Sequence, residues 1–268
     1  MGKITQEQRN RYFEMVKEYR KTIEAGLAKE KTLLELLGKE ESGAAYKRLF
    51  LAETVLDLSS WYVLVNGLSV SLLGLKNEDY LLEGRKTLVR ALKYLEDTVT
   101  ATLDGPFSDY EDRLAEIKDY DAASRYRLAR KFGFAVQSLE EAFGENSKYS
   151  WSFLEIWGKF AAVSKNLVDL KSAIADLDFN SPTRPVVMGH LALVKGQLQR
   201  CADRYREQYE LYTHKHQDFK QAIAYLSALR RLHMNLGERD DAETMKKKAD
   251  VWNSKLEADS KKQEEKKR

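Results

Sequence analysis

One uncharged run restricts what this chain can fold into more than any other feature. Residues 58–75 read LSSWYVLVNGLSVSLLGL and contain no acidic or basic side chain. With the more mixed residues before them, they make one candidate helix over 44–75. A helix that is apolar on nearly every side needs partners on nearly every side. The run therefore predicts either the central helix of a soluble helical array or a membrane span.

The polar residues in the run favour a soluble array. A membrane-spanning helix needs about 20 predominantly apolar residues, which places the run at the lower limit. Ser59, Ser60, Asn66, Ser69 and Ser71 interrupt it, and no Lys/Arg cluster flanks either end to set an orientation. We therefore expect no membrane span and a helix that is buried inside the fold.

Proline is scarce, with only Pro106, Pro182 and Pro185 in 268 residues. Long segments thus run without a helix breaker, and none shows the sustained alternation of a β-strand. At 1.5 Å per residue, a helix over 44–75 would be roughly 48 Å long, longer than a small domain is wide. These features predict an all-α fold, an elongated array of about eight or nine long helices packed as antiparallel hairpins.

Capping and turn signals predict where several helices begin and end. Thr5 and Gln8 have the spacing of a capping box at the start of the first helix. The third helix is expected to run from about Asn77 to the turn at 104–106, and a later one from about Ser147 to Leu177.

The segment 178–185, DFNSPTRP, is the clearest linker in the chain. It predicts an N-terminal lobe of residues 1–180 around the helix 44–75, and a C-terminal lobe of residues 181–258. The charged tail 259–268 has nothing to bury, so we expect it to be disordered.

The segment 224–253 resembles a degenerate tetratricopeptide repeat. The matching positions are Leu226 and Leu229 on a first helix, Leu236-Gly237 at the turn, and Ala242 and Ala249 on a second helix. Small residues allow the second helix to pack closely against the first, and glycine allows the tight reversal. The sequence departs from the family at His233, Arg239 and Lys246, where aromatic or large apolar residues are usual. The resemblance implies a tetratricopeptide-like hairpin at the C-terminal end.

The same resemblance implies a binding surface. In the tetratricopeptide family, another face of the first helix lines a groove that holds partner peptides. The corresponding positions here are Ser227, Arg231, Met234 and Asn235, which supply a hydroxyl, a positive charge, a thioether and an amide. The alternative is a hairpin that only caps the helical array.

Trp151 is a second candidate for partner binding. Its neighbours Tyr149, Phe153, Trp157 and Phe160 form one helical stripe, which is most simply core. Trp151 lies off that stripe, so it is a candidate exposed aromatic anchor, with core packing as the alternative.

Motifs for catalysis and metal binding are missing from the sequence. Among the four histidines, His214 and His216 fall on different helix faces. No Glu-x-x-His, His-Glu-x-x-His, Gly-x-Ser-x-Gly or phosphate-loop pattern occurs. The single cysteine, Cys201, excludes an internal disulfide and a cysteine-based metal site. We therefore expect no enzymatic activity, no cofactor and no metal.

Charge balance argues against nucleic acid as a partner. The chain has 45 basic and 42 acidic residues and a net charge of +3, which indicates a solvated surface of mixed charge. The basic cluster at 125–131 is interpreted as a solvated face paired with nearby acids. We expect one or more protein partners, also within a larger assembly, and no nucleic acid.

The predicted function is a non-enzymatic helical scaffold for protein–protein interaction or assembly. The chain as a whole is also similar to the elongated helical structural proteins of spirochete flagellar sheaths and collars, although no motif carries this similarity. It implies a filament component as one alternative; a membrane- or lipid-associated protein that uses residues 61–75 is another.

The compartment stays open. The start, MGKITQEQRNRYF, has no apolar signal core. The default expectation is cytoplasmic, or periplasmic if the Met1-Gly2 start replaces a removed signal peptide.

Overall fold

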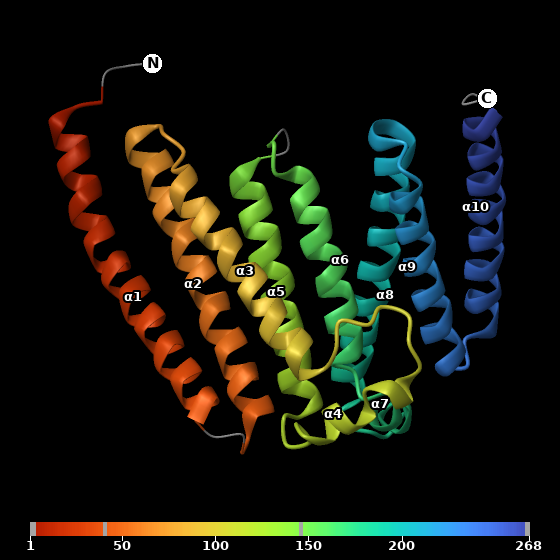
Figure 1. Ribbon diagram of the computed structural model, residues 1–268. Helices are drawn as coiled ribbons and strands as arrows, with labels where there is room; N and C mark the ends of the chain where they lie inside the picture. The colour runs from red at the N-terminus through yellow and green to blue at the C-terminus, as the bar shows by residue number, and fades with distance from the viewer. Residues whose placement is uncertain (1–3, 40–41, 145–146, 266–268) are drawn as a thin grey trace. The chain divides into compact units, whose positions relative to one another are not determined.

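The computed structural model describes residues 4–39, 42–144 and 147–265, and in this part the chain forms helices and turns without a strand. The all-α prediction is therefore confirmed. The helices are α1 (Gln6–Lys39), α2 (Ala44–Leu73), α3 (Glu78–Thr98), α4 (Glu111–Ala115), α5 (Ala122–Phe143), α6 (Ser150–Asn166), α7 (Leu170–Asp176), α8 (Arg184–Glu207), α9 (His216–Asn235) and α10 (Arg239–Glu265), with a 3₁₀ helix η1 (Phe107–Asp109) and a π-helix η2 (Gln208–Thr213) (Figure 1). The Met1-Gly2 start lies outside the described residues.

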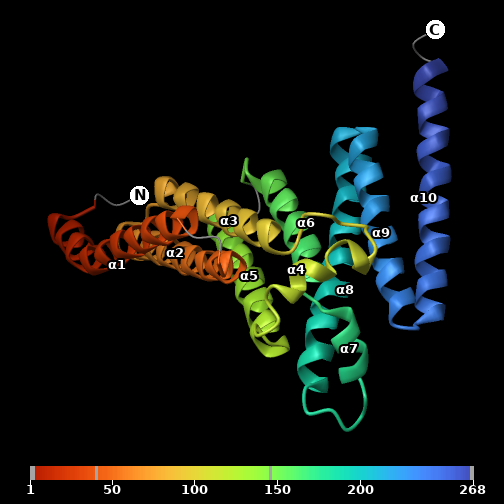
Figure 2. The ribbon, with the colours of Figure 1, turned by 60° about the horizontal axis from the view of Figure 1, so that its bottom comes forward.

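Most of these helices are long and pack as antiparallel neighbours. Only α4 and α7 are short, with 5 and 7 residues, which leaves eight long helices in the described part, as expected. Helix α2 packs against both α1 and α3, and α9 packs against both α8 and α10. Figures 1 and 2 show the helices of each set lying side by side.

The chain divides into two compact units. The first comprises residues 1–100, 116–118 and 127–156, and the second comprises 101–115, 119–126 and 157–268. These bounds differ from the expected division between residues 180 and 181. Because the chain passes between the units several times, a linker signal in the sequence does not mark their limits.

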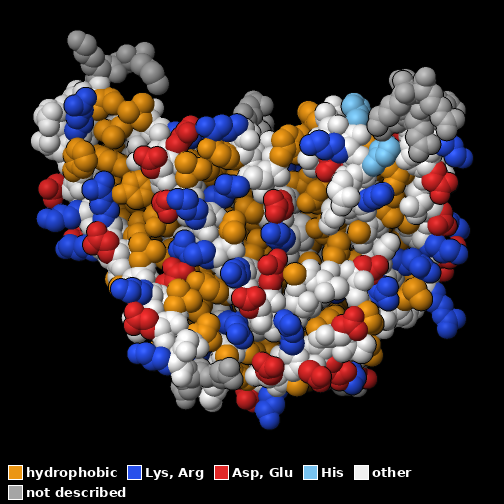
Figure 3. All heavy atoms as spheres, in the orientation of Figure 1, with side chains coloured by type: hydrophobic (Ala, Val, Ile, Leu, Met, Phe, Trp, Pro, Cys, Tyr) orange, Lys and Arg blue, Asp and Glu red, His pale blue; other side chains and the backbone are white. Residues whose placement is uncertain are grey.

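Helix α2 is the centre of the first unit, but within the uncharged run 58–75 it is buried on one face only. Val65 is fully buried, whereas the side chains of Leu64 and Val70 are 49% and 46% exposed. Figure 3 shows hydrophobic side chains at the surface among charged ones. From the sequence, we expect residues 58–75 to be buried on nearly every side. In the structure, only the side chains spaced three or four residues apart on one face are buried. Within the described residues, α2 alone has the length and hydropathy of a membrane span, a test that core helices also pass.

Two expected helices end early or break. Helix α3 stops at Thr98 instead of continuing to the turn at 104–106, and Thr100 follows with a φ of 146°. The helix expected from Ser147 to Leu177 is interrupted between α6 and α7. Asp169 begins the new helix, because its side chain accepts hydrogen bonds from the backbone N–H groups of Lys171 and Ser172.

The structure describes residues 259–265 of the charged tail, for which we expect disorder from composition, as helix. Helix α10 continues to Glu265, and residues 266–268 lie outside the described part. The Tyr209 hydroxyl donates to an Asp259 carboxylate oxygen at 2.8 Å. This long-range contact fixes a segment whose composition alone predicts disorder.

The second unit is built around close helix approaches. A methyl group at Gly158 on α6 would lie 2.2 Å from the Tyr225 hydroxyl on α9, so only glycine allows this packing. Leu226 and Leu229 on α9 and Ala242 on α10 are buried, and the two helices pack against each other. Gly237, with a φ of 75°, makes the turn between them. The hairpin forms where expected, while its tetratricopeptide character stays a prediction.

Candidate functional site

The four residues predicted on α9 do not act as one set. Arg231, Met234 and Asn235 are exposed and Ser227 is half-buried. Only Arg231 and Asn235 line a cavity in the second unit. Trp151 is 39% exposed, and it belongs to the first unit. The structure therefore places two of the five predicted residues at one cavity and leaves the other three outside it.

This cavity, the Arg231 cavity, is defined by three segments of the second unit. It has a volume of about 250 Å³ and is lined by Pro106, Phe107, Leu170, Lys171, Ile174, Arg231 and Asn235. The apolar residues come from the η1 segment and from α7, where Ile174 is 49% exposed. Helix α9 contributes the polar residues Arg231 and Asn235, and α7 contributes Lys171. The result is an apolar surface with cations beside it.

Both cations of the Arg231 cavity are held by acids. The Arg231 Nε donates to Asp104 Oδ1 at 2.6 Å, and this contact raises the pKa of Arg231. The Lys171 ammonium pairs with Glu111, which raises the pKa of Lys171. Their side chains remain 46% and 70% exposed. The two positive charges are thus fixed in position and still reachable from solvent.

A buried lysine lies next to the Arg231 cavity. Lys165 is 6% exposed and donates to Asn166 Oδ1 at 2.5 Å. Its Nζ lies 5.0 Å from the centre of the Tyr110 ring. In the described part of the chain it pairs with no carboxylate. Burial lowers the pKa of Lys165 to about 8. Lys165 also lines a small space that Asp104, Tyr110, Arg231 and Asn235 share.

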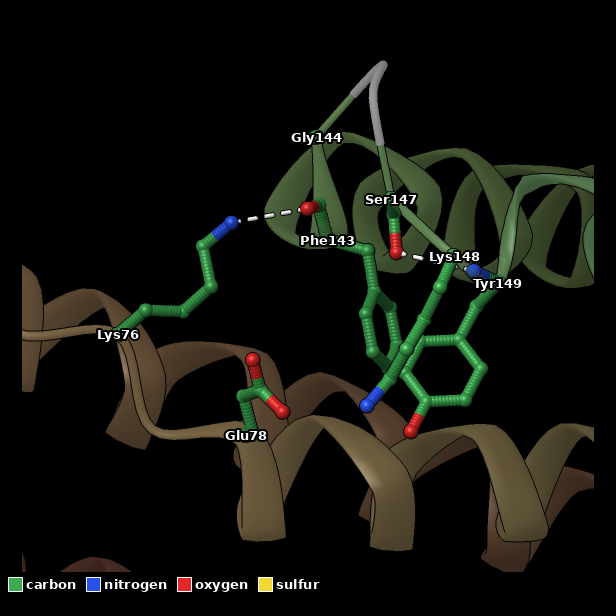
Figure 4. Close-up of a pocket in the computed structure, with 7 residues that line it drawn as sticks. All are labelled: Lys76, Glu78, Phe143, Gly144, Ser147, Lys148 and Tyr149. Carbon is green, nitrogen blue, oxygen red and sulfur yellow. Dashed lines mark hydrogen bonds between the residues drawn. The ribbon is translucent and has the colours of Figure 1, made fainter.

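The first unit has its own cavity, the Tyr149 cavity, of about 500 Å³ (Figure 4). It is lined by Lys76, Glu78, Phe143, Gly144, Ser147, Lys148 and Tyr149. Lys76 Nζ donates to the carbonyl of Phe143 at 2.8 Å, which satisfies an acceptor at the end of α5. The Tyr149 ring packs edge-on against Phe143, with 5.0 Å between ring centres.

One cluster has the composition of a metal site. His233, Glu238 and Asp241 place ligand atoms within 4.8 Å of one another. However, Lys195 Nζ lies 2.6 Å from both carboxylate oxygens of Glu238. His233 Nδ1 lies 2.6 Å from one of them. An ammonium already holds the carboxylate that a cation would need, so the cluster is best described as an ion network at the α9–α10 turn.

Sequence reasoning missed most of these groups. Asp104, Phe107 and Ile174 carry no local signal, because they meet α9 only through the fold. Lys165 does carry one. It is the single charged residue in the apolar run FAAVSKNLV. A lysine at such a position on a buried helix face is predicted to be shielded from solvent.

Three comparisons with known proteins complete the description. The model of the TP0443 family matches residues 8–260, which is nearly the whole chain. No curated protein and no solved structure matches the chain.

Proposed function

We propose that this chain, which belongs to the TP0443 family, is a non-enzymatic protein-binding scaffold that docks a partner segment in the Arg231 cavity. The observation that supports this most is an exposed apolar surface between two fixed cations. Buried anchors with charged groups at the rim are the usual anatomy of a protein interface.

The charges define the partner segment. It has an apolar side chain that covers Ile174 and a nearby carboxylate that meets Arg231 or Lys171. The Arg231 contact with Asp104 uses Nε, and within the described residues its terminal nitrogens make no other hydrogen bond. Those donors are suited to a second carboxylate.

Exposed substitutions test this surface. Ile174→Asp places a negative charge in the apolar part of the cavity and should abolish capture of the partner by the purified chain. Val251→Asp is the matched control, because Val251 is also an exposed apolar residue of the second unit, at 66%. Surface substitutions seldom change stability by more than about 0.5 kcal/mol, so both variants should melt like the parent. Equal capture by the Ile174→Asp variant would contradict the proposal.

Arg231 needs a milder substitution than charge reversal. Arg231→Glu would set a carboxylate against Asp104, and the repulsion would disturb the loop as well as the interface. Arg231→Gln removes the charge and keeps a hydrogen-bond donor, so it isolates the contribution to binding.

A second candidate function rests on α2. Its partly exposed apolar face, with Leu64 and Val70 near half exposure, favours association with lipid as the alternative. Detergent-free solubility of the purified chain distinguishes the two. Assembly into a filament stays an expectation from the resemblance alone.

A further inference from the structure

The loop between α7 and α8 carries the most exposed large hydrophobic side chain of the described residues. Phe179 is 84% exposed, and it lies in the segment 177–183 that joins the two helices. Figure 2 shows this loop beyond the ends of α7 and α8. Single exposed apolar residues are common at protein surfaces, so the meaning of Phe179 depends on how the loop holds it and on what lies beside it.

Hydrogen bonds fix the shape of the loop around Phe179. The Ser181 backbone N–H donates to the Asp178 carbonyl at 3.1 Å. The Asn180 backbone N–H donates to Asp178 Oδ1 at 2.9 Å, which adds the side-chain bond that often stabilises such turns. The Arg184 guanidinium carbon lies 5.6 Å from the centre of the Phe179 ring. The ring is therefore presented by a preformed turn, and an anchor held in this way loses little conformational entropy on binding.

Two carboxylates accompany the ring. Asp176 Oδ1 accepts the Ser181 hydroxyl at 3.2 Å, and Asp178 accepts the Asn180 backbone N–H through one oxygen. Within the described residues neither carboxylate pairs with a lysine or an arginine. Asp178 is exposed, so its second oxygen remains available to a further donor.

The Arg231 cavity has the complementary features. Lys171 pairs with Glu111 and Arg231 pairs with Asp104, and the two cationic side chains are still 70% and 46% exposed. An ammonium has three donors and a guanidinium five, so one acid does not use all of them. At 84% exposure, Phe179 does not fill the cavity of its own chain. The cavity offers an apolar surface made by Pro106, Phe107, Leu170 and Ile174.

We propose that the Asp178-Phe179 turn of one copy of this chain docks in the Arg231 cavity of a second copy. This inference rests on the docking surface of the proposed function and names its occupant. The Phe179 ring covers Ile174 of the other copy, and the Asp178 carboxylate meets Lys171 or Arg231 there. The turn supplies the apolar side chain and the nearby carboxylate that the cavity requires.

The loop and the cavity share α7, which makes the surface complementary to itself. Lys171 lies in the first turn of α7, and Asp176 is its last residue. Two antiparallel copies of α7 place the acidic end of each beside the Lys171 end of the other. The contact is then made twice across a two-fold axis, as in most homodimers.

The oligomeric state of the full chain tests the proposal. An interface of one short helix and one loop belongs to the small, weak class. Sedimentation velocity from about 10 μM to about 1 mM should therefore show a monomer that gives way to a dimer. Added salt should weaken the dimer, because exposed charges form part of the contact.

Two substitutions remove the two halves of the contact. Phe179→Ser removes the ring, and Ile174→Asp places a charge where the ring packs. Each should weaken dimerisation about tenfold or more, because each removes an anchor from both contacts. Val251→Ser is the matched control, since Val251 is 66% exposed on α10 and lies outside the cavity lining.

A mixture of the two variants gives the sharpest result. A heterodimer keeps one intact contact, between the unaltered turn of the Ile174→Asp variant and the unaltered cavity of the Phe179→Ser variant. The mixture should therefore dimerise at concentrations where neither variant does so alone. A mixture that dimerises no better than the separate variants overturns the proposal.

Two other results also overturn it. One is a parent that stays monomeric up to about 1 mM, and the other is a dimer that both substitutions leave unchanged. If the parent is monomeric but the Ile174→Asp variant still loses capture of a different partner, self-docking fails and the docking surface stands. If the parent dimerises through the turn, the docking surface is supported as well, so the two failures are distinguishable.

Discussion

At the scale of single residues, Lys165 gives the sharpest expectation. Burial lowers the pKa of its ammonium group to about 8, from the ordinary lysine value of 10.5. Between these two values the unfolded chain keeps a proton that the folded chain has lost. The free energy of unfolding therefore rises with pH over this range, by about 3 kcal/mol in total. Lys165→Met should remove this rise, as urea unfolding at several pH values between 7 and 10.5 would show.

The comparison must be made between variant and parent. Burial also raises the pKa of Tyr110 and of Cys201 to about 12, and these groups titrate in both proteins, so their effects cancel in the difference. Lys159→Met, at an exposed position of the same helix, controls for the loss of one positive charge. A difference between parent and Lys165→Met that is constant with pH would mean that Lys165 is well solvated.

Arg231 shows how far local reasoning reaches at this scale. Its place on an exposed face of α9 beside Asn235 could be predicted from helical spacing. Its partner Asp104 could not, because 127 positions separate the two residues. The sequence thus indicates which side chains lie on the exposed face of one helix. Which of them pair with residues far away in the chain depends on the fold.

At the scale of elements, α2 shows that the hydropathy of a residue does not by itself predict its burial. Val65 is fully buried and Val63 only in part, although both lie in the same uncharged run. Val65→Asp buries an unpaired charge and should cost about 4 kcal/mol or more, whereas Val63→Asp should cost about 1 kcal/mol. Urea denaturation of the two variants measures the difference. Equal costs would show that both faces of α2 are covered, as a fully enclosed or membrane-embedded helix requires.

Helix limits were predictable where a local capping pattern sets them. The Thr5 backbone N–H donates to Gln8 Oε1 at 2.9 Å and the Gln8 N–H donates to Thr5 Oγ1 at 3.2 Å, so the expected capping box forms. The break before α7 also has a local cause in Asp169, which sequence reasoning overlooked. At the end of α3, the Val99 backbone N–H donates to the Leu95 carbonyl, and no local sequence pattern predicted this limit.

At the scale of the whole molecule, the all-α class followed from scarce proline and helical periodicity, but the division into units did not. Composition marks the linker-like segment 178–185, whereas a compact unit depends on contacts between distant segments. In the second unit, Tyr225 packs on Gly158, and Tyr126 packs on Gly189. Both contacts cross the expected boundary at residue 180.

Two fragments decide between the divisions. Fragment 101–268 contains all of the second unit, with residues 116–118 and 127–156 of the first as insertions. Fragment 181–268 is the C-terminal lobe expected from the linker together with the tail. It keeps α8, α9 and α10 but lacks Gly158, Tyr126 and Asp104, the partners of Tyr225, Gly189 and Arg231. We expect fragment 101–268 to unfold in one cooperative thermal transition followed by circular dichroism. Fragment 181–268 should melt broadly and at lower temperature, because its buried α8 and α9 residues lose part of their cover. If both fragments melt at the same temperature and equally sharply, helices α8, α9 and α10 suffice for a stable fold. The linker at 178–185 would then mark a true domain boundary.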